Sequence, residues 1–293
     1  MADRRLVPQR TRLAGMNAGS RLLAISDLHV GHADNRELVA GLVPDSPTDW
    51  LIVAGDVAER MADVVWALRL LTQRFGRVIW VPGNHELWTT PGDPVTLRGE
   101  QRYRRLVEAC RALGVITPED PYPVWEGPGG PVTVAPLFLL YDYTFRPPGV
   151  RTKEDALALA YESGVLCTDE VLLHPDPYGS RDAWSAARVG ATERRLAALG
   201  GRPVVLVNHF PLVREPTSVL RYPQFALWCG TTRTADWHRR FNAVAVVYGH
   251  LHIRRTTWHD GRPFMDVSVG YPREWSTRNR STGPCQVLPL PGA

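Results

Sequence analysis

The chain has 293 residues, 44% of them hydrophobic and 22% charged, which is the composition of an ordinary globular protein with a sizeable core. Its net charge of +4 permits acidic partners, but no motif for binding nucleic acid accompanies this charge. No apolar run approaches the roughly 20 residues that a helix needs to cross a bilayer. These features exclude a disordered chain and predict no nucleic-acid and no membrane partner.

The two ends of the chain differ in composition from the part between them. Residues 1–20 are basic and lack the apolar core of a secretory signal, so we expect a flexible leader, within which Met16 is an alternative start to Met1. Regular patterning without repeats or linkers predicts one domain over 21–276, followed by a surface tail over 277–293 that is rich in Pro and Gly. The four cysteines form no CxxC pair, which is typical of reduced thiols in a cytoplasmic protein.

Three predicted strands in the first third of the chain, within residues 22–31, 50–54 and 77–81, are each followed by a polar loop. An amphipathic helix is predicted over 61–75 because apolar residues recur there at helical spacing. Strands that alternate with helices favour a parallel sheet, in which ligands bind at the carboxyl ends of the strands. The polar residues at these ends are Asp27 and His29, then Asp56, then Asn84 and His85.

Two later predicted strands, at 203–207 and 244–248, end in the same manner. The first is followed by His209 and the second by His250 and His252. Side chains two residues apart in an extended segment leave it on the same side, which brings together the side chains of an Asp-x-His or His-x-His pair. A single His after a strand is usually a solvated loop residue, but the repetition makes this interpretation improbable. Carboxylate, amide and imidazole donors without thiolate suit Mn, Fe or Zn.

The ordered motifs D-x-H, G-D, G-N-H-E, a lone His and G-H-L-H resemble the signature of the calcineurin-like metallophosphoesterases over residues 22–269. The resemblance implies an α/β fold, a four-layer α/β/β/α sandwich of two mixed sheets flanked by helices. It also implies a metal-dependent phosphoric ester hydrolase with two transition-metal ions, Mn and/or Fe or else Zn. Two such ions can clamp a phosphoryl group and make hydroxide available at neutral pH.

The resemblance also implies a role for each site residue. One metal ion is expected on Asp27, His29, Asp56 and His252, and the other on Asp56, Asn84, His209 and His250, with the Asp56 carboxylate bridging. His85 matches a histidine that binds no metal and faces the scissile phosphate, where it would act as general acid or as a stabilising cation. Glu59 supplies the acid that often follows the G-D motif in relatives. For Glu86, two roles remain open: orienting a site imidazole, or lying at the surface.

A narrower resemblance, carried by DWLIVAGDVAER, VIWVPGNHELWTT, PLFLLYDYTF, LWCGTTRTADWH, VYGHLH and VSVGYPREW, points to the actinobacterial phosphopantetheinyl hydrolases. It implies hydrolysis of the phosphodiester that joins the 4′-phosphopantetheine arm to a serine of a holo carrier protein, with acyl or peptidyl carrier proteins as partners. The product would be the apo carrier.

Residues outside the predicted metal-binding motifs are expected to contact this substrate. Asp142, Tyr143 and Trp228 are candidates for substrate binding, although packing in the core is the more common role of such aromatics. Carrier proteins are typically acidic, so Arg254, Arg255 and Arg273, downstream of the G-H-L-H motif, are expected to steer them towards the site.

Other functions compete with this interpretation. The same site could serve a cyclic-nucleotide diesterase, a nucleotide hydrolase or a protein phosphatase. A nuclease is disfavoured because the basic, aromatic-lined track expected for a nucleic-acid strand is not evident. A binding module without activity would have lost ligands, and none is missing from the motifs. The sequence leaves the oligomeric state open.

Overall fold

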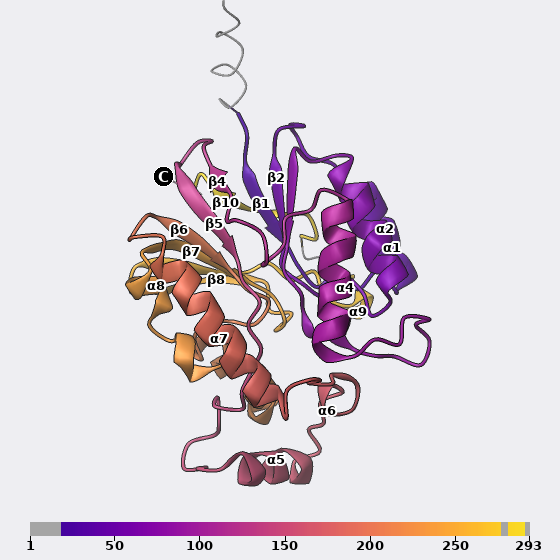
Figure 1. The fold of residues 1–293 in the computed structure, drawn as a ribbon, viewed down its shortest axis with the longest axis vertical. Helices are drawn as coiled ribbons and strands as arrows, with labels where there is room; N and C mark the ends of the chain where they lie inside the picture. Colours follow the sequence, from indigo (N-terminus) through magenta and orange to yellow (C-terminus); the bar gives the residue numbers. More distant parts are fainter. Residues whose placement is uncertain (1–18, 277–280, 291–293) are drawn as a thin grey trace, which may run out of the picture.

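The computed structural model describes residues 19–276 and 281–290 (Figure 1). Nearly all of the predicted leader, 1–20, therefore lies outside the described residues. Part of the predicted surface tail is described and differs from the prediction, because it contains strand β10 (Cys285–Leu288). β10 pairs antiparallel with β1, and Val287 and Leu288 are buried. The folded domain thus continues beyond residue 276.

Two mixed sheets form the centre of the molecule, as the resemblance implies. The first has the order β10-β1-β2-β3, in which β1 (Leu22–Ile25), β2 (Trp50–Val53) and β3 (Arg77–Trp80) are parallel. The second has the order β4-β5-β6-β7-β9-β8, with antiparallel pairing only at its two edges. Its strands are β4 (Val124–Trp125), β5 (Val132–Pro136), β6 (Val204–Val207), β7 (Ala243–Tyr248), β8 (Arg255–His259) and β9 (Arg262–Asp266).

Successive side chains of each strand point to opposite faces of its sheet, so the core is divided into three layers. In β1, Leu22 and Ala24 face the second sheet, in a cluster with residues such as Val205 of β6. Leu23 and Ile25 face the other way, into a cluster with the helices that cover the first sheet. Because both faces of each sheet are apolar, both must be covered, and the predicted four-layer sandwich is confirmed.

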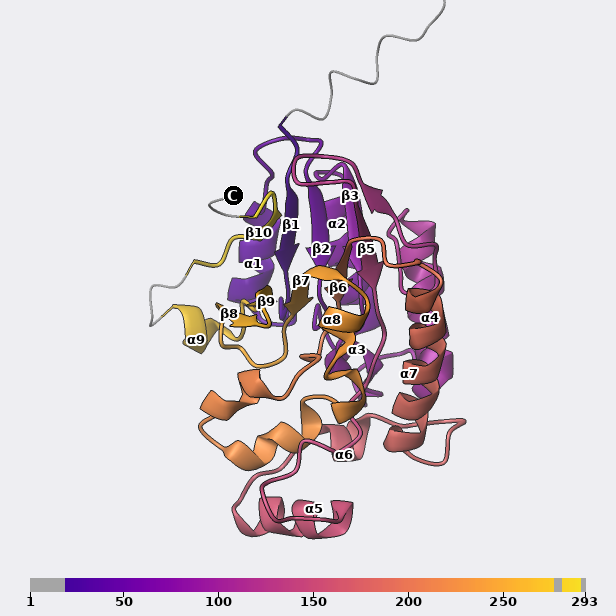
Figure 2. The same ribbon diagram turned by 90° about the vertical axis from the view of Figure 1, so that its left-hand side faces the viewer.

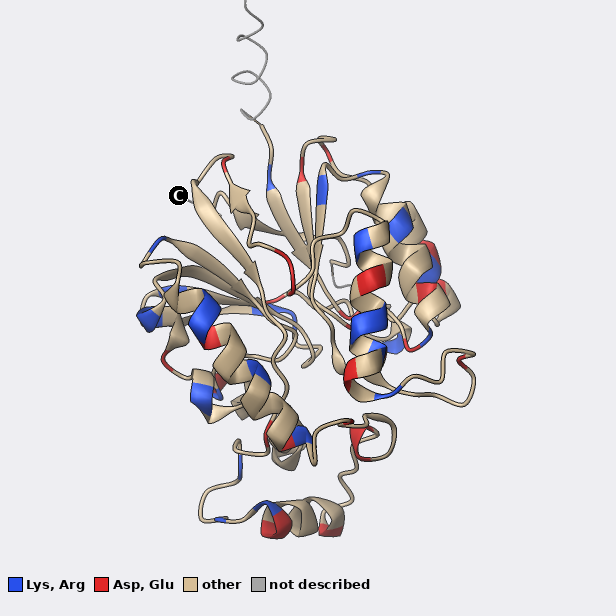
Figure 3. Ribbon diagram, in the orientation of Figure 1, with Lys and Arg blue, Asp and Glu red and all other residues tan. Residues whose placement is uncertain are grey.

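Helices cover the outer faces of the two sheets (Figures 1 and 2). On the first sheet lie α1 (Ala33–Gly41), α2 (Met61–Thr72) and α4 (Gly99–Ala112). On the second lie α7 (Arg181–Ala197) and α8 (Trp237–Arg240). Figure 3 shows charges of both signs along α4 and α7, whereas the strands between the helices are almost free of them. No helix among the described residues is long and apolar enough to cross a membrane.

Short helices gather beyond the carboxyl ends of the strands (Figure 2). A lobe formed by residues 141–180 carries α5 (Lys153–Glu162) and α6 (Asp169–Leu172). The remaining short helices are α3 (Asn84–Leu87), α9 (Pro272–Trp275) and the 3-10 helices η1 (Glu215–Val219), η2 (Pro223–Trp228) and η3 (Thr232–Thr234). The lobe contacts the η1–η2 segment through a hydrogen bond of 3.1 Å from Gln224 Nε2 to Ser163 Oγ. This end of the sandwich therefore has more irregular structure than the opposite end.

Candidate metal centre

The polar residues that the sequence placed at strand ends meet where the two sheets converge. The first sheet contributes Asp27, His29, Asp56 and Asn84, and the second contributes His209, His250 and His252. Nearly all of these side chains are buried, and His252 is half-buried. Residues more than 200 positions apart, such as Asp27 and His252, thus lie within 3.1 Å of each other.

The backbone at these positions is not extended. Positive φ angles, which are uncommon for residues other than glycine, occur at Asp27 (54°), His29 (40°), Asp56 (52°), His250 (70°) and His252 (53°). The extended conformation predicted for the Asp-x-His and His-x-His pairs is therefore wrong, although their side chains still converge. Each such conformation costs on the order of 1–3 kcal/mol and persists only where the surrounding structure fixes it.

Two glycines of the motifs leave room for the carboxylates. A Cβ on Gly83 would lie 2.1 Å from Asp56 Oδ1, and a Cβ on Gly249 would lie 2.3 Å from Asp27 Oδ2. No side chain fits at either position without displacing a carboxylate. Backbone N–H groups close to these glycines donate hydrogen bonds to the same carboxylates. His85 N, two residues after Gly83, donates to Asp56 Oδ1 at 3.0 Å, and His250 N, directly after Gly249, lies 3.1 Å from both Asp27 oxygens.

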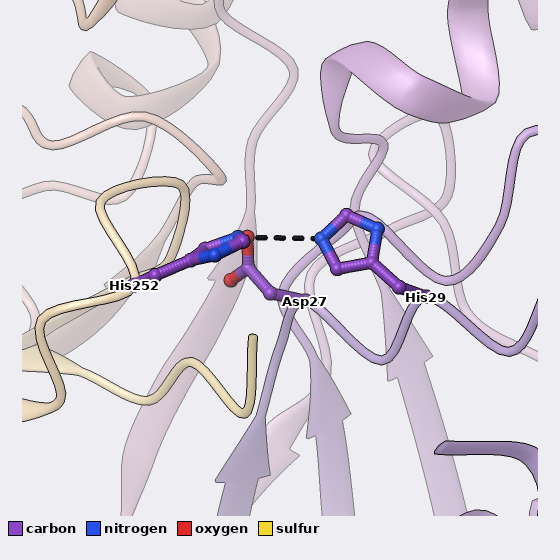
Figure 4. Close-up of side chains that lie close together, drawn as sticks. All are labelled: Asp27, His29 and His252. Atoms are coloured by element: carbon purple, nitrogen blue, oxygen red, sulfur yellow. Dashed lines mark hydrogen bonds and ion pairs between the residues drawn. The ribbon is translucent and has the colours of Figure 1, made fainter. Parts of the chain in front are cut away.

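A first group of possible ligands consists of Asp27, His29 and His252, with donor atoms within 4.8 Å of one another. His252 Nε2 lies 3.1 Å from Asp27 Oδ1 and 3.2 Å from His29 Nε2. Figure 4 shows the two imidazole rings converging beside the Asp27 carboxylate. Two ring nitrogens and a carboxylate oxygen at these distances are a suitable donor set for a transition-metal ion.

A second group consists of Asp27, Asp56 and His209. His209 Nε2 lies 3.4 Å from Asp56 Oδ2 and 3.2 Å from Asn84 Oδ1. Asp27 thus belongs to both groups, whereas the resemblance assigned the bridging position to Asp56. Glu59 and His85 form a third group with His29. Their short contact is described below.

Hydrogen bonds at Nδ1 fix the orientation of two imidazoles, those of His209 and His252. His209 Nδ1 lies 2.9 Å from the Ala54 carbonyl oxygen, and His252 Nδ1 lies 2.7 Å from Glu274 Oε2. Nδ1–H of each ring donates a hydrogen bond to its oxygen, which leaves Nε2 of each ring directed into the centre. Such contacts behind a metal-binding imidazole typically select its tautomer and orientation. Glu274 lies in the VSVGYPREW segment, but nothing in the sequence indicated this role, because its partner lies 22 residues away in a different element.

The negative charges of the buried Asp27 and Asp56 carboxylates are compensated by neighbouring imidazoles. Burial raises the pKa of Asp27, but the His252 and His209 imidazoles outweigh this effect and hold the pKa below its usual value. The same balance, with His209 as main partner, holds the pKa of Asp56 low. Burial lowers the pKa of His209 and of His252, but the carboxylates raise both pKa values to about 10. A bound cation would replace these protons as the compensating charge.

The other two imidazoles are neutral. Burial lowers the pKa of His29 and of His250 to about 3, so neither is protonated near neutral pH. The neutral imidazole is the form that binds metal ions. His250 Nε2 is buried without a hydrogen-bond partner in the part of the chain that the structure describes. Unpaired buried polar atoms are costly, so this nitrogen and the surrounding oxygen and nitrogen donors fit a metal centre well.

Glu86 has neither of the roles considered from the sequence. It is fully buried, and its carboxylate accepts the backbone N–H groups of Asp56 (3.0 Å), Val57 (2.9 Å) and Gly83 (3.0 Å). It therefore joins the loop after β2 to the loop after β3. Burial, together with the nearby Asp56 carboxylate, raises the pKa of Glu86 to about 7.

His85 lies beside the proposed ligands and is held on two sides. Its Nδ1 lies 2.8 Å from Glu59 Oε1, and its ring lies 3.7 Å from the Trp88 ring. Its Nε2 lies 3.7 Å from Asp56 Oδ2. Burial lowers the pKa of His85, but Asp56 and Glu59 outweigh burial, so the pKa is raised and the protonated form is favoured. A protonated imidazole with a fixed orientation is suited to proton donation.

A cleft of about 720 Å³ opens above these residues. Its floor includes Asp56, Asn84, His85 and His250. One wall is formed by residues 219–222 and Phe225 of the η1–η2 segment, and the other by residues 251–253 together with Arg255, Tyr271, Arg273 and Glu274. Tyr271 on the second wall stacks on His29 at 4.4 Å.

The three residues predicted to bind substrate lie elsewhere. Asp142, Tyr143 and Trp228 are buried, and the lining of the cleft, as far as the described chain forms it, contains none of them. Asp142 accepts a hydrogen bond of 2.7 Å from Thr231, and Tyr143 and Trp228 both donate to Glu170 at 2.8 Å. These contacts join the lobe to the η2–η3 region, which indicates a structural role.

Comparison with known proteins gives consistent results. The model of the calcineurin-like phosphoesterase family matches residues 20–254. The acyl-carrier-protein phosphodiesterase PptH of Mycobacterium tuberculosis (strain ATCC 25618 / H37Rv) is 58% identical over 277 residues, which cover 94% of this chain and 86% of that protein. The crystal structure of phosphopantetheinyl hydrolase (PptH) from Mycobacterium tuberculosis matches with a TM-score of 0.93 and 57% identity, over 96% of this chain and 99% of the other.

The metal centre can be tested by substitution of its carboxylates. If Asp56 bridges two ions, Asp56→Asn should lose both of them, because the shared carboxylate is removed. Metal content per chain is measured by inductively coupled plasma mass spectrometry after equilibration with Mn²⁺ or Fe²⁺. Asp142→Asn, which changes a buried carboxylate outside the centre, is the control and should retain the wild-type content. Loss of a single ion in Asp56→Asn would show that this carboxylate does not bridge.

Proposed function

The chain belongs to the calcineurin-like phosphoesterase family, and from this premise we propose that it hydrolyses the phosphodiester between 4′-phosphopantetheine and the serine of an acyl carrier protein. The observation that carries the proposal is a cleft with His85, held by Glu59, beside the converging carboxylate, amide and imidazole donors on its floor. Phosphoester hydrolysis needs charge compensation and a proton for the leaving group, and this floor provides groups for both. The extensive similarity to PptH supports the choice of substrate.

For the proposed centre we keep the ligands that the resemblance implies, and the convergence of their side chains supports this choice. One ion would be held by Asp27, His29, Asp56 and His252, and the other by Asp56, Asn84, His209 and His250. Manganese and iron fit these nitrogen and oxygen donors, and zinc is compatible with them. When bound, two such ions would compensate the charge on the phosphoryl oxygens and supply a nucleophile at neutral pH.

His85 is the proposed proton donor to the serine oxygen as the bond from that oxygen to phosphorus breaks. A serine alkoxide is a poor leaving group, so this proton is needed when the bond breaks. Glu59 fixes the ring through Nδ1, which leaves Nε2 for the substrate. Because Asp56 and Glu59 raise the pKa of His85, the imidazole retains its proton to a higher pH than an exposed histidine does.

The two walls of the cleft suit the two halves of the substrate. Val219, Leu220 and Tyr222 precede Phe225 on the η1–η2 wall, and Val219 and Tyr222 are 48% and 54% exposed. Beyond its phosphate the pantetheine arm carries no charge, so we place it along this largely apolar wall. The carrier would lie over the arginines at the rim of the cleft.

The arginines at the rim differ in part from those expected. Arg255 and Arg273 line the cleft, and Arg221 lines it as well. Arg254 does not belong to this set, because its guanidinium contacts the Gly283 carbonyl and Cys285 Sγ near β10. Arg221 and Arg255 form no ion pair with any described residue, so their charge is available to an acidic partner. We also infer a cytoplasmic location, which the four free cysteines support.

The direct test of the function is incubation of metal-loaded protein with a holo acyl carrier protein, followed by intact-mass analysis. We expect the carrier to lose the mass of the phosphopantetheine arm and to remain as the apo form. An intact holo carrier, together with efficient cleavage of a cyclic nucleotide or a phosphoprotein, would overturn the proposed substrate.

Substitution of His85 separates chemistry from metal binding. His85→Ala should retain wild-type metal content but lose on the order of 10²–10⁴ in kcat on holo carrier, the usual contribution of a positioned proton donor. The loss should be much smaller for bis(p-nitrophenyl) phosphate, whose nitrophenolate departs without protonation. Equal losses of kcat on both substrates would argue against the role as acid.

Reversal of charge at the rim tests recognition of the carrier. Arg221→Glu combined with Arg255→Glu should lower kcat/KM for holo carrier on the order of 10-fold, because electrostatic steering is lost. Added salt should lower the wild-type rate and affect the variant less, since screening removes the same attraction. Activity on bis(p-nitrophenyl) phosphate should change little.

The matched control is Arg69→Glu with Arg194→Glu, which changes the net charge equally on exposed positions of α2 and α7. Equal effects of the two double variants would show that net charge alone, and not the rim of the cleft, attracts the carrier.

A further inference from the structure

Asp169, the first residue of α6, is fully buried and lies beside the proposed metal centre. Its Oδ1 accepts two hydrogen bonds, from Asn84 Nδ2 at 2.9 Å and from Trp88 Nε1 at 2.6 Å. Its Oδ2 is buried without a hydrogen-bond partner among the residues that the structure describes. Neither the motifs nor the resemblance assigned a role to this carboxylate.

The backbone fixes the position of Asp169. The segment after α3 pairs with the end of α6: Trp88 forms an antiparallel bridge with Leu173, and Thr89 N donates to Leu172 O at 3.0 Å. On the other side, Arg181 Nη2 donates to the Asp169 carbonyl oxygen at 2.7 Å. The short helix α6 is thus held between the segment after α3 and the first residue of α7, and these backbone contacts fix the position from which the Asp169 side chain extends.

The contact with Asn84 determines which end of its amide faces the centre. Asp169 Oδ1 accepts the indole N–H of Trp88, a group that can only donate, and the same oxygen selects the orientation in which Asn84 Nδ2 points towards it. Asn84 Oδ1 then points the other way, 3.2 Å from His209 Nε2. In the opposite orientation the amide would present N–H groups to a cation, and these cannot bind it.

The contact of Asp169 with Trp88 affects the position of the His85 ring. The Trp88 ring packs against the His85 ring, with centroids 3.7 Å apart and planes inclined by 30°. Because its indole N–H donates to Asp169, the rotation of the Trp88 ring is fixed. The His85 ring is then enclosed between Trp88 on its face and Glu59 at Nδ1.

We propose that Asp169 is a positioning residue for this centre, which orients the metal-binding oxygen of Asn84 and, through Trp88, the ring of His85. This inference rests on the proposed function, because it takes Asn84 as a ligand and His85 as the proton donor. One carboxylate of the lobe thus supports both the binding of the second ion and the transfer of the proton.

Substitution of Asp169 provides the test. Asp169→Ala should weaken the binding of one of the two ions on the order of 10–100-fold, the usual effect of removing a group that orients a ligand. It should also lower kcat on holo carrier more than it changes KM. Metal affinity is measured by competition with a chromogenic chelator, which gives a readout independent of turnover. Asp169→Asn keeps an oxygen that can accept both hydrogen bonds and should restore a large part of the affinity.

The adjacent Glu170 supplies a matched control. Its carboxylate binds Tyr143, Trp228 and Arg181 instead of the centre, so Glu170→Gln tests the stability of the lobe alone. Its metal affinity should remain at the wild-type value even if its Tm falls. Trp88→Phe removes the five-membered ring of the indole with its N–H and keeps a smaller aromatic ring against His85. It should lower kcat on holo carrier while both ions stay bound.

The outcomes distinguish the role of Asp169 from the existence of the proposed metal centre. A folded Asp169→Ala protein that binds both ions with wild-type affinity and has wild-type kcat would overturn the positioning role. Equal losses of metal affinity in Asp169→Ala and Glu170→Gln would overturn it too, because they would show a general effect of the lobe. If the wild-type protein itself binds no ions, the proposed centre fails, independently of Asp169.

Discussion

The structure depends on the burial of two carboxylates, Asp27 and Asp56, at the point where two sheets converge. A buried charge is costly unless it is paired and hydrogen-bonded. Here the backbone N–H groups of His250 and His85 and the imidazoles of His252 and His209 provide the compensation. The first sheet thus supplies both carboxylates and the second sheet supplies three of these four partners, which explains why one site requires both halves of the sandwich.

Much of this arrangement could be predicted from the sequence, because it depends on local patterns. Apolar runs that end in polar residues give the strands and the edge at which the site forms. The left-handed backbone of residues such as Asp27 could not be read in this way, since the close packing against Gly249 that fixes it is a tertiary contact. Strand β10 was missed for a similar reason: its short sequence, CQVL, becomes a strand only by pairing with β1.

The residues around the centre were harder to predict than its proposed ligands. Tyr143 and Trp228 have the chemistry of a substrate pocket but are buried against Glu170. Glu274 and Asp169, by contrast, contact the proposed ligands, although the sequence assigned neither of them a role. Their role follows from partners 22 and 85 residues away. Composition and periodicity describe single elements, so contacts between elements remain invisible to them.

The lobe supports both the chemistry and the substrate wall through consecutive residues of α6. Asp169 faces the first sheet and holds Asn84 and Trp88, whereas Glu170 faces the other way and accepts the indole N–H of Trp228 at the end of η2. Phe225 in the same 3-10 helix lines the cleft and stacks on His250 at 5.7 Å. Asp169 and Glu170 are consecutive residues of α6, so one short helix of the lobe contacts both the proposed metal centre and the segment that forms the apolar wall. The proposed metal centre and the wall proposed to bind the substrate therefore share one structural support.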